Sequence, residues 1–254
     1  LLQSGVASAE RVFELLDAEQ QRSDPEGVVL AGRDGGPGRI AFEDVSFSYG
    51  EEPLIEDLSL VAEPGQTVAI VGPTGAGKTT LVNLILRFYE LDGGRITLDG
   101  SDLLDKSVKQ RLRAGIGFVP EDRSTDGVVS SFTIAENLVL DLYDTEPFAR
   151  GISMSPAKVH ANAERRTEEF DVRYTSVQDP ISTLSGGNAQ KVVLAREMSR
   201  PLRLLVASQP TRGLDVGSIE FIHRQAITWA KDGEVILQIT GIGPTGTTMI
   251  PQKQ

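Results

Sequence analysis

The stretch that decides the fold is Gly72-Pro73-Thr74-Gly75-Ala76-Gly77-Lys78-Thr79. It matches the pattern G-x-x-x-x-G-K-[ST] and follows the apolar run Thr67 to Val71, which is typical of a buried parallel strand. A predicted helix from Lys78 to Glu90 comes directly after it. Glycines allow backbone N–H groups to turn toward phosphate oxygens, and the helix adds the positive end of its dipole. The stretch therefore predicts a phosphate-binding loop in an α/β domain.

The polar residues of this loop have expected roles. Lys78 is expected to reach the β- and γ-phosphates of ATP, and Thr79 is expected to ligate Mg²⁺. The predicted cofactor-binding residues of the loop are Gly72, Pro73, Thr74, Gly75, Ala76, Gly77, Lys78, Thr79 and Thr80.

Length and composition fit a soluble globular protein. The 254 residues suffice for one α/β domain or two small ones, with 39% hydrophobic and 24% charged residues. No run approaches the roughly 20 apolar residues of a membrane-spanning helix, so association with a membrane would need a partner. Cysteine is absent, which excludes a disulfide framework and thiolate metal sites. A cytoplasmic location fits this composition.

The charge pattern argues against a nucleic-acid partner. The net charge is −11, whereas nucleic-acid binders usually present a basic face. The short basic runs at Arg111-Leu112-Arg113 and Arg165-Arg166 are interpreted as solvated helix faces.

The sequence pattern divides the chain into four parts. Residues 1–20 have the periodicity of a helix, and the polar, Gly- and Pro-rich residues 21–38 are typical of a linker. Residues 39–240 are expected to form the globular domain, and 241–254 a flexible end. Residues 122–182, without a clear central strand, are expected to form an inserted helical lobe.

Alternating and periodic patterns predict the elements of this domain. Strands are expected at Ile40 to Tyr49 and at Leu54 to Val61, which together would form a small antiparallel β layer. Within the lobe, helices are expected at Ile134 to Leu142 and at Pro156 to Phe170.

Two further motifs follow the loop at a characteristic spacing. Leu184-Ser185-Gly186-Gly187-Asn188-Ala189-Gln190 begins 106 residues after Lys78, and Pro210-Thr211-Arg212-Gly213-Leu214-Asp215 comes after the next strand. Taken alone, Ser-Gly-Gly before a helix is an ordinary cap and turn. In this order, the three motifs resemble the nucleotide-binding domain of ABC transporters. The resemblance implies a P-loop NTPase (RecA-like) parallel sheet core with an antiparallel β layer and an inserted helical lobe.

The resemblance also implies how the site is completed. In this family two such domains pair head to tail, and each ATP lies between the phosphate loop of one and the signature motif of the other. Ser185, Gly186 and Gly187 are expected to approach the γ-phosphate. Tyr49 matches the family's adenine-stacking aromatic, and Asp215 matches the loop that couples the two ATP sites.

The resemblance has two components. Residues 1–100 resemble multidrug-type exporters whose membrane and ATPase domains share one chain, which implies that residues 1–20 are the cytosolic end of the last membrane helix. Residues 101–224 resemble the second ATPase half of nucleoside or sugar importers. The chain therefore has the pattern of a mosaic.

The chain departs from the family's catalytic pattern at three places, which involve four residues. Ser208 and Gln209 stand where family members carry Asp-Glu, and Gln209 can orient a water molecule but cannot take its proton. Glu121 stands where the family has a Gln that senses the γ-phosphate, and its carboxylate can still ligate Mg²⁺. Gly241 occupies the slot of the family's histidine. The expected catalytic residues are Gln209 and Glu121, and the expected metal ligands are Thr79 and Glu121.

These observations predict an ATP-binding domain that couples ATP binding to transport through a partner membrane domain, located at the inner face of the cell membrane. The alternative is a non-hydrolysing clamp that pairs with a second ABC ATPase domain and completes its ATP site. A role in translation or DNA repair would want a second ATPase cassette or a long coiled-coil insertion, and the sequence shows neither.

Overall fold

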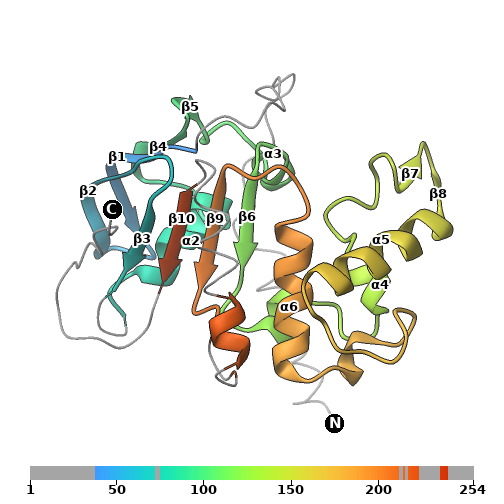
Figure 1. The fold of residues 1–254 in the computed structure, drawn as a ribbon. Helices are drawn as coiled ribbons and strands as arrows, with labels where there is room; N and C mark the ends of the chain where they lie inside the picture. Colours follow the sequence, from blue (N-terminus) through green and yellow to red (C-terminus); the bar gives the residue numbers. More distant parts are fainter. Residues whose placement is uncertain (1–37, 72–74, 212–213, 215–216, 223–234, 240–254) are drawn as a thin grey trace, which may run out of the picture.

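Two sheets and a helical lobe make up the computed structural model, which describes residues 38–71, 75–211, 214, 217–222 and 235–239 (Figure 1). The predicted helix at 1–20, most of the linker and the tail at 241–254 lie outside the described residues. Within the described part, none of the helices is long and apolar enough to cross a membrane.

The first sheet is the expected antiparallel layer. Its strands are β1 (Ile40–Ser48), β2 (Pro53–Ala62), β4 (Gly93–Leu98) and β5 (Ser101–Asp102), in the order β2-β1-β4-β5. The register of β1 shifts around Asp44, whose φ is 50°. Gly94 has a φ of 76°, and a Cβ there would lie 2.3 Å from the Asp44 carbonyl oxygen, so only glycine fits beside this bulge.

The second sheet is the parallel core. It contains β3 (Thr67–Ile70), β10 (Val235–Ile239), β9 (Leu204–Ser208) and β6 (Ile116–Val119), in the order β3-β10-β9-β6. All five residues of β9 are buried, as expected for a strand covered on both faces. Leu204 and Val206 pack into one core cluster, and Leu205 and Ala207 pack into the other.

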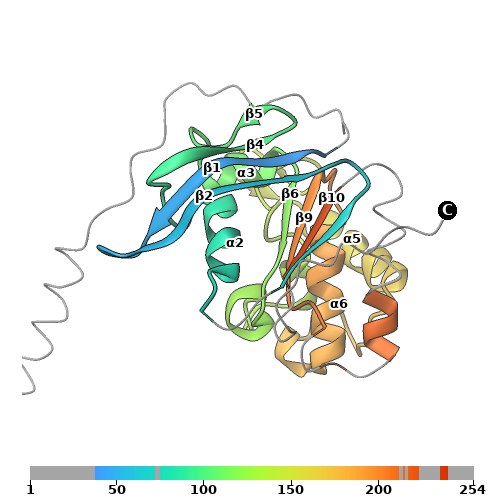
Figure 2. The ribbon, with the colours of Figure 1, turned by 90° about the vertical axis from the view of Figure 1, so that its left-hand side faces the viewer.

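Helix α2 (Lys78–Leu86) lies between the two sheets (Figure 2). Its buried residues join the antiparallel layer to one face of the parallel sheet in a single hydrophobic cluster. The helix is shorter than the predicted Lys78 to Glu90. Arg87 adopts a left-handed conformation with a φ of 63°, and its N–H bonds back to Asn83 and Leu84, which ends the helix.

The other face of the parallel sheet is covered by α6 (Gly186–Glu197) and by the helical lobe. The lobe includes η1 (Arg123–Gly127), α4 (Ile134–Asn137), β7 (Ala149–Arg150), β8 (Ser153–Met154), α5 (Pro156–Glu169) and η2 (Ile181–Thr183). A further helix covers residues 217–222.

Helix α4 ends well before the predicted Leu142. After Asn137 the backbone makes i to i+3 bonds, as from the Leu142 N–H to the Val139 carbonyl, so the chain continues as turns. The small β7–β8 hairpin was not anticipated by the sequence pattern.

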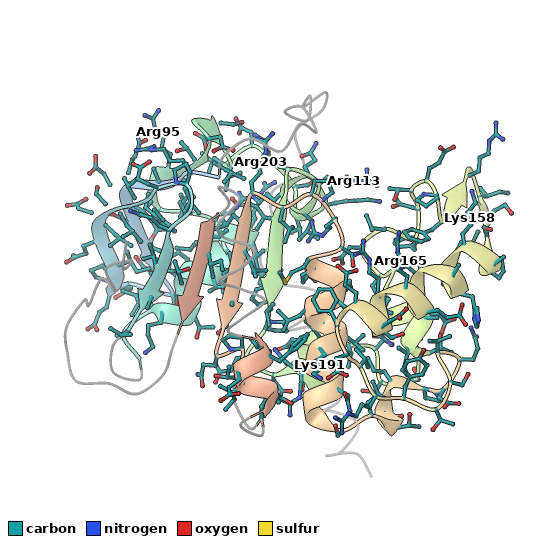
Figure 3. The ribbon with its side chains drawn as sticks, viewed as in Figure 1. Arg95, Arg113, Lys158, Arg165, Lys191 and Arg203 are labelled. Atoms are coloured by element: carbon teal, nitrogen blue, oxygen red, sulfur yellow. The ribbon has the colours of Figure 1, made fainter. Side chains whose placement is uncertain are left out.

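Helix α3 (Val108–Arg113) connects the core to the lobe at the surface. Lys109 and Arg113 both pair with Asp144 of the lobe, and their hydrogen bonds hold the pKa of Asp144 below its usual range. Figure 3 shows Arg113 extending from α3 toward the lobe.

A buried ionic cluster fixes the end of α6 to β6. Glu197 is 2% exposed and pairs with Arg196 at 2.9 Å and with Arg200 at 2.8 Å. Its carboxylate also accepts the N–H of Phe118. Burial alone would raise the pKa of Glu197, but the two guanidinium groups outweigh it and hold the pKa below its usual value.

Replacement of Glu197 by Ala is expected to destabilise the fold by about 3–5 kcal/mol, because it leaves two buried guanidinium groups without their shared carboxylate. Urea unfolding would measure the change. The matched control is Glu164→Ala, which removes an exposed carboxylate beside His160 and should cost less than about 0.5 kcal/mol. Equal effects of the two substitutions would contradict the assigned role of the cluster.

Candidate functional site

The carboxyl ends of the parallel strands meet at one edge of the sheet. The register pairs Ile239 of β10 with Ile70 of β3 and with Ser208 of β9, and it pairs Val119 of β6 with Ala207. The residues that follow β3, β9 and β6 therefore leave the sheet side by side. In open α/β sheets, this edge is where ligands bind.

The phosphate loop connects β3 to α2 at this edge. Gly72, Pro73 and Thr74 lie outside the described residues, whereas the second half of the loop is described. Gly75 has a φ of 87° and Gly77 a φ of 77°, conformations that glycine adopts without strain. Gly77 precedes the helix without a side-chain cap, and the first turn of α2 contains no acidic residue. The first N–H groups of α2 are thus placed for an anion.

Lys78, Thr79 and Thr80 begin α2, as the motif requires. Thr79 is exposed, Lys78 is half-buried and Thr80 is buried. Lys78 and Thr79 are therefore accessible at the edge of the sheet, whereas Thr80 packs in the interior.

Tyr49 contacts the same helix, α2, through its side chain. Its hydroxyl lies 3.1 Å from the hydroxyl of Thr80, and its ring packs edge to face with Phe47 and Tyr89 at centroid distances of 4.8 and 5.0 Å. The side chain is nevertheless 58% exposed. A largely exposed ring held next to the phosphate loop can stack on a planar base.

The end of β9 carries two neutral residues. Ser208 is 2% exposed, and its hydroxyl has no hydrogen-bond partner in the described structure. Gln209 follows with a φ of 45°, a left-handed conformation that is uncommon for a residue with a side chain and that concentrates at functional sites.

Two carboxylates follow β6 at the same edge. Asp122 is occupied by the local turn, because its side chain accepts the N–H groups of Ser124 and Thr125, which lowers its pKa. Glu121 is half-buried. Among the residues that the structure describes, no group of three or more acidic or histidine side chains could hold a metal ion without help from a ligand.

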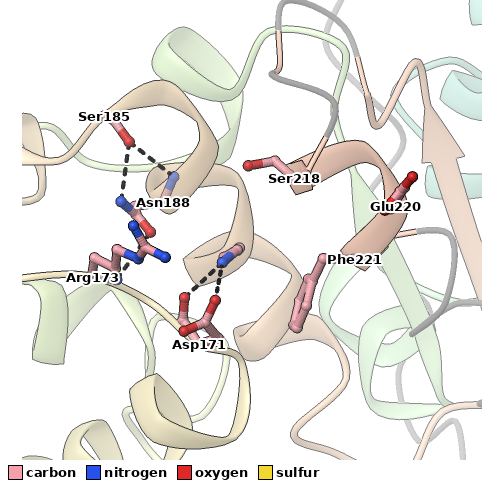
Figure 4. Close-up of a pocket in the computed structure, with 9 residues that line it drawn as sticks. Asp171, Arg173, Ser185, Asn188, Ser218, Glu220 and Phe221 are labelled. Carbon is pink, nitrogen blue, oxygen red and sulfur yellow. Dashed lines mark hydrogen bonds and ion pairs between the residues drawn. The ribbon is translucent and has the colours of Figure 1, made fainter.

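The signature motif opens α6 at the lobe. Ser185 is the N-cap residue, and its Oγ accepts the N–H of Asn188 at 3.4 Å and the side-chain amide of Asn188 at 3.1 Å (Figure 4). The amide oxygen of Asn188 accepts the N–H of Arg173 at 3.0 Å. Since the Ser185 oxygen accepts both bonds, its own proton is directed elsewhere and can be donated to a ligand.

Arg123 lies against the start of this helix. A Cβ at Gly186 would lie 2.4 Å from an Nη atom of Arg123, so the missing side chain leaves room for the guanidinium. The sequence pattern assigns no role to Arg123. A contact between residues so far apart in the chain has no local sequence signal. The glycine at position 186 is the one feature of the motif that relates to it.

A polar pocket of about 480 Å³ adjoins Ser185 (Figure 4). Lys191 pairs with Asp171 at 2.8 Å, which lowers the pKa of Asp171, and its ammonium lies 4.7 Å from the centre of the Phe221 ring. The residues that line the pocket are Asp171, Arg173, Ser185, Asn188, Lys191, Gly217, Ser218, Glu220 and Phe221.

The predicted site residues thus fall into two groups. The phosphate loop, Tyr49 and Gln209 belong to the β3–β9 side of the edge, and Ser185, Gly186 and Gly187 belong to α6. Figure 1 shows α6 beyond β6, at the opposite end of the strand order from β3. Asp215 and Gly241 lie outside the described residues.

Comparison with known proteins places these features in a family context. The family model described as "ABC transporter" matches residues 55–212. A nucleoside import ATP-binding protein of Lactococcus lactis is 39% identical over 73% of this chain and 37% of its own length. A fatty acid ABC transporter ATP-binding/permease protein of Mycobacterium bovis is 42% identical over 88% of this chain and 34% of its own. The chain therefore spans about a third of the length of these relatives.

Solved structures that resemble this chain come from the same family. A bacterial Atm1-family ABC exporter with ATP bound has a TM-score of 0.70 and 26% identity, covering 94% of this chain and 40% of the exporter. An ATP-binding cassette solved as a dimer in a post-hydrolysis state, with ADP and phosphate bound, has a TM-score of 0.66 and 25% identity. It covers 79% of this chain and 87% of that cassette. Relatives of both predicted kinds, exporter-type and nucleoside-importer-type, are thus confirmed.

Replacement of Asn188 by Ala is expected to release the segment at Arg173 and to leave Ser185 with only its backbone bond, at a cost of about 1–2 kcal/mol for two lost side-chain hydrogen bonds. Hydrogen exchange should show faster exchange of the Arg173 amide. Gln178→Ala is the control, since it removes only an exposed bond to His160. Unchanged exchange at Arg173 in the Asn188 variant would refute the proposed bridge.

Proposed function

Since the chain belongs to the ABC transporter family, in which it is an ATP-binding domain, we propose that it binds ATP at the carboxyl edge of the parallel sheet. The single observation that carries this proposal is that β3, which leads into the phosphate loop, and β9 end at the same edge of the sheet, on either side of β10. Lys78 and the first N–H groups of α2 bind the phosphates. The exposed ring of Tyr49, held beside α2 by Thr80, stacks on the adenine.

Mg²⁺ fits the donor set of this edge. The ion prefers oxygen ligands and usually binds through one or two carboxylates together with substrate phosphates and water. Thr79 supplies a hydroxyl and Glu121 a carboxylate, and we assign the metal to these two residues. When bound, the ion would neutralise charge on the phosphates.

A second ATP-binding domain completes the site. The signature residues Ser185, Gly186 and Gly187 begin α6, which lies beyond β6, at the opposite end of the strand order from β3. Head-to-tail pairing with another ABC ATPase domain, identical or different, brings them to the partner's ATP. The donor proton of Ser185 then meets the γ-phosphate, and Asp215 couples the two sites. A membrane domain at the inner face of the cell membrane uses this closure for transport.

The family catalyses ATP hydrolysis, but the residues of this chain favour slow turnover. The water that attacks the γ-phosphate needs a group that polarises it, and Gln209 can orient this water without accepting its proton. Glu121, which follows β6 at the same edge of the sheet, is the alternative carboxylate. The second candidate function is therefore a clamp that binds ATP, pairs with a competent domain and supplies Ser185 to its site. The neutral pair Ser208 and Gln209 favours this candidate.

The purified domain is expected to bind ATP and to hydrolyse it about 10²- to 10⁴-fold more slowly than a competent relative, the usual effect of a missing general base. Binding by calorimetry and steady-state phosphate release would measure both. Lys78→Ala should abolish binding while leaving the fold intact. Rapid turnover that Lys78→Ala removes would contradict the clamp and assign the water to another carboxylate, with Glu121→Gln as the next variant.

Replacement of Gln209 by Glu is expected to raise turnover by less than about tenfold, because Ser208 and Gly241 still lack the family's Asp and His. Single-turnover hydrolysis would measure the change, with Gln209→Asn as the neutral control. A gain above a hundredfold in the Glu variant would show that the general base was the only defect.

A further inference from the structure

The buried, neutral end of β9 bears on how this site handles a metal. Ser208 is 2% exposed and its hydroxyl has no hydrogen-bond partner in the described structure. A buried carboxylate in this place would need a cation beside it, whereas a hydroxyl needs none. Ser208 is therefore compatible with a site that contains no metal ion.

The position of β9 makes its charge relevant to the phosphates. β10 lies between β3 and β9, and Ile239 pairs with both Ile70 and Ser208. With strands about 4.8 Å apart, the ends of β3 and β9 lie about 10 Å from each other. A charge at the end of β9 would act on phosphates held between the loop and this strand, since the edge is screened less than open solvent.

Carboxylates at these positions would repel the negative triphosphate unless a divalent cation lay between them. Ser208 and Gln209 place no negative charge there. Lys78 and the uncapped first turn of α2 still attract the phosphates, and this attraction does not depend on a metal. Of the two carboxylates that follow β6, Asp122 accepts the N–H groups of its own turn, and Glu121 is the one assigned to the ion above.

We propose that this domain binds ATP with little dependence on Mg²⁺, so that metal-free ATP and its Mg²⁺ complex bind with similar affinity. This inference rests on the proposed function, because it concerns the same site. It separates binding from hydrolysis: the nucleotide would be held, and pairing with a second domain supported, even where the ion is absent.

The test is a pair of ATP titrations by calorimetry, one with excess EDTA and one with excess Mg²⁺, at matched ionic strength. The two dissociation constants are expected to agree within about fivefold, since Ser208 and Gln209 place no carboxylate at the end of β9 whose repulsion of the phosphates the ion would have to offset. A loss of more than about a hundredfold in EDTA would overturn the proposal.

Variants at the end of β9 test whether its neutral residues are the reason that ATP binding depends little on Mg²⁺. Ser208→Asp should weaken metal-free binding by about ten- to a hundredfold and leave Mg²⁺-dependent binding nearly intact. Ser208→Asn has the same shape without the charge and should retain metal-free binding. If the Asp variant does not fold, as circular dichroism would reveal, Gln209→Glu tests the same charge at a half-buried position, with Gln209→Asn as its control.

Two results distinguish failure of this inference from failure of the proposed function. Equal losses in the Asp and Asn variants would show that shape rather than charge controls binding, and would overturn the inference alone. Absence of ATP binding by the unmodified domain under both conditions would overturn the proposed function and the inference with it. Lys78→Ala sets the background of both titrations.

Discussion

The buried pair of guanidinium groups around Glu197 is the interaction on which the arrangement of the site depends. It joins three parts of the chain, because Arg196 donates to the carbonyl of Gly127, the last residue of η1, and Arg200 donates to the Ile116 carbonyl of β6. The carboxyl end of α6 is therefore fixed to the core sheet. Since a helix is rigid over this length, its amino end, which carries Ser185, is fixed as well.

The same cluster includes Asp141, whose ionised form is destabilised by burial at neutral pH. Burial and the nearby Glu197 raise the pKa of Asp141 to about 6, and one Asp141 oxygen has no hydrogen-bond partner in the described structure. An unfolded Asp titrates near 3.8. The folded state thus binds this proton more tightly, so the stabilisation is complete below the unfolded pKa and is lost as pH rises through about 6. The cluster is retained at neutral pH because Arg196 and Arg200 satisfy backbone carbonyls that apolar side chains would leave unpaired.

Local signals in the sequence were sufficient for most of the elements. The loop from Gly72 to Thr79 predicted its strand and helix, and the alternation in β1 and β2 predicted the antiparallel layer. Helix ends were less predictable, because the left-handed Arg87 and the turns after Asn137 have no periodic signature. The insertion of β10 between β3 and β9 was also hidden, since strand order is set by packing over long sequence separations.

The candidate site, like the fold, was only partly predictable from the sequence. The spacing of the phosphate loop predicted Lys78 and Thr79, and the resemblance of the later motif to the family predicted Ser185. The bridge from Asn188 to Arg173 and the contact of Arg123 with Gly186 join segments that are not adjacent in the chain, so spacing could not indicate them.

The burial of charge differs between the end of α6 and the end of β9. At α6, ionised groups are buried only where each meets a partner of opposite sign, as Glu197 meets Arg196 and Arg200. At β9, the buried Ser208 is neutral and meets no partner. If the same physical rule holds at both places, a carboxylate at Ser208 would be stable only with a permanent cation, and the neutral residue frees the site from that requirement. On the proposals made above, the neutral Ser208 and Gln209, which favour slow turnover, are also the residues that allow Lys78 and the start of α2 to bind the phosphates without a metal ion.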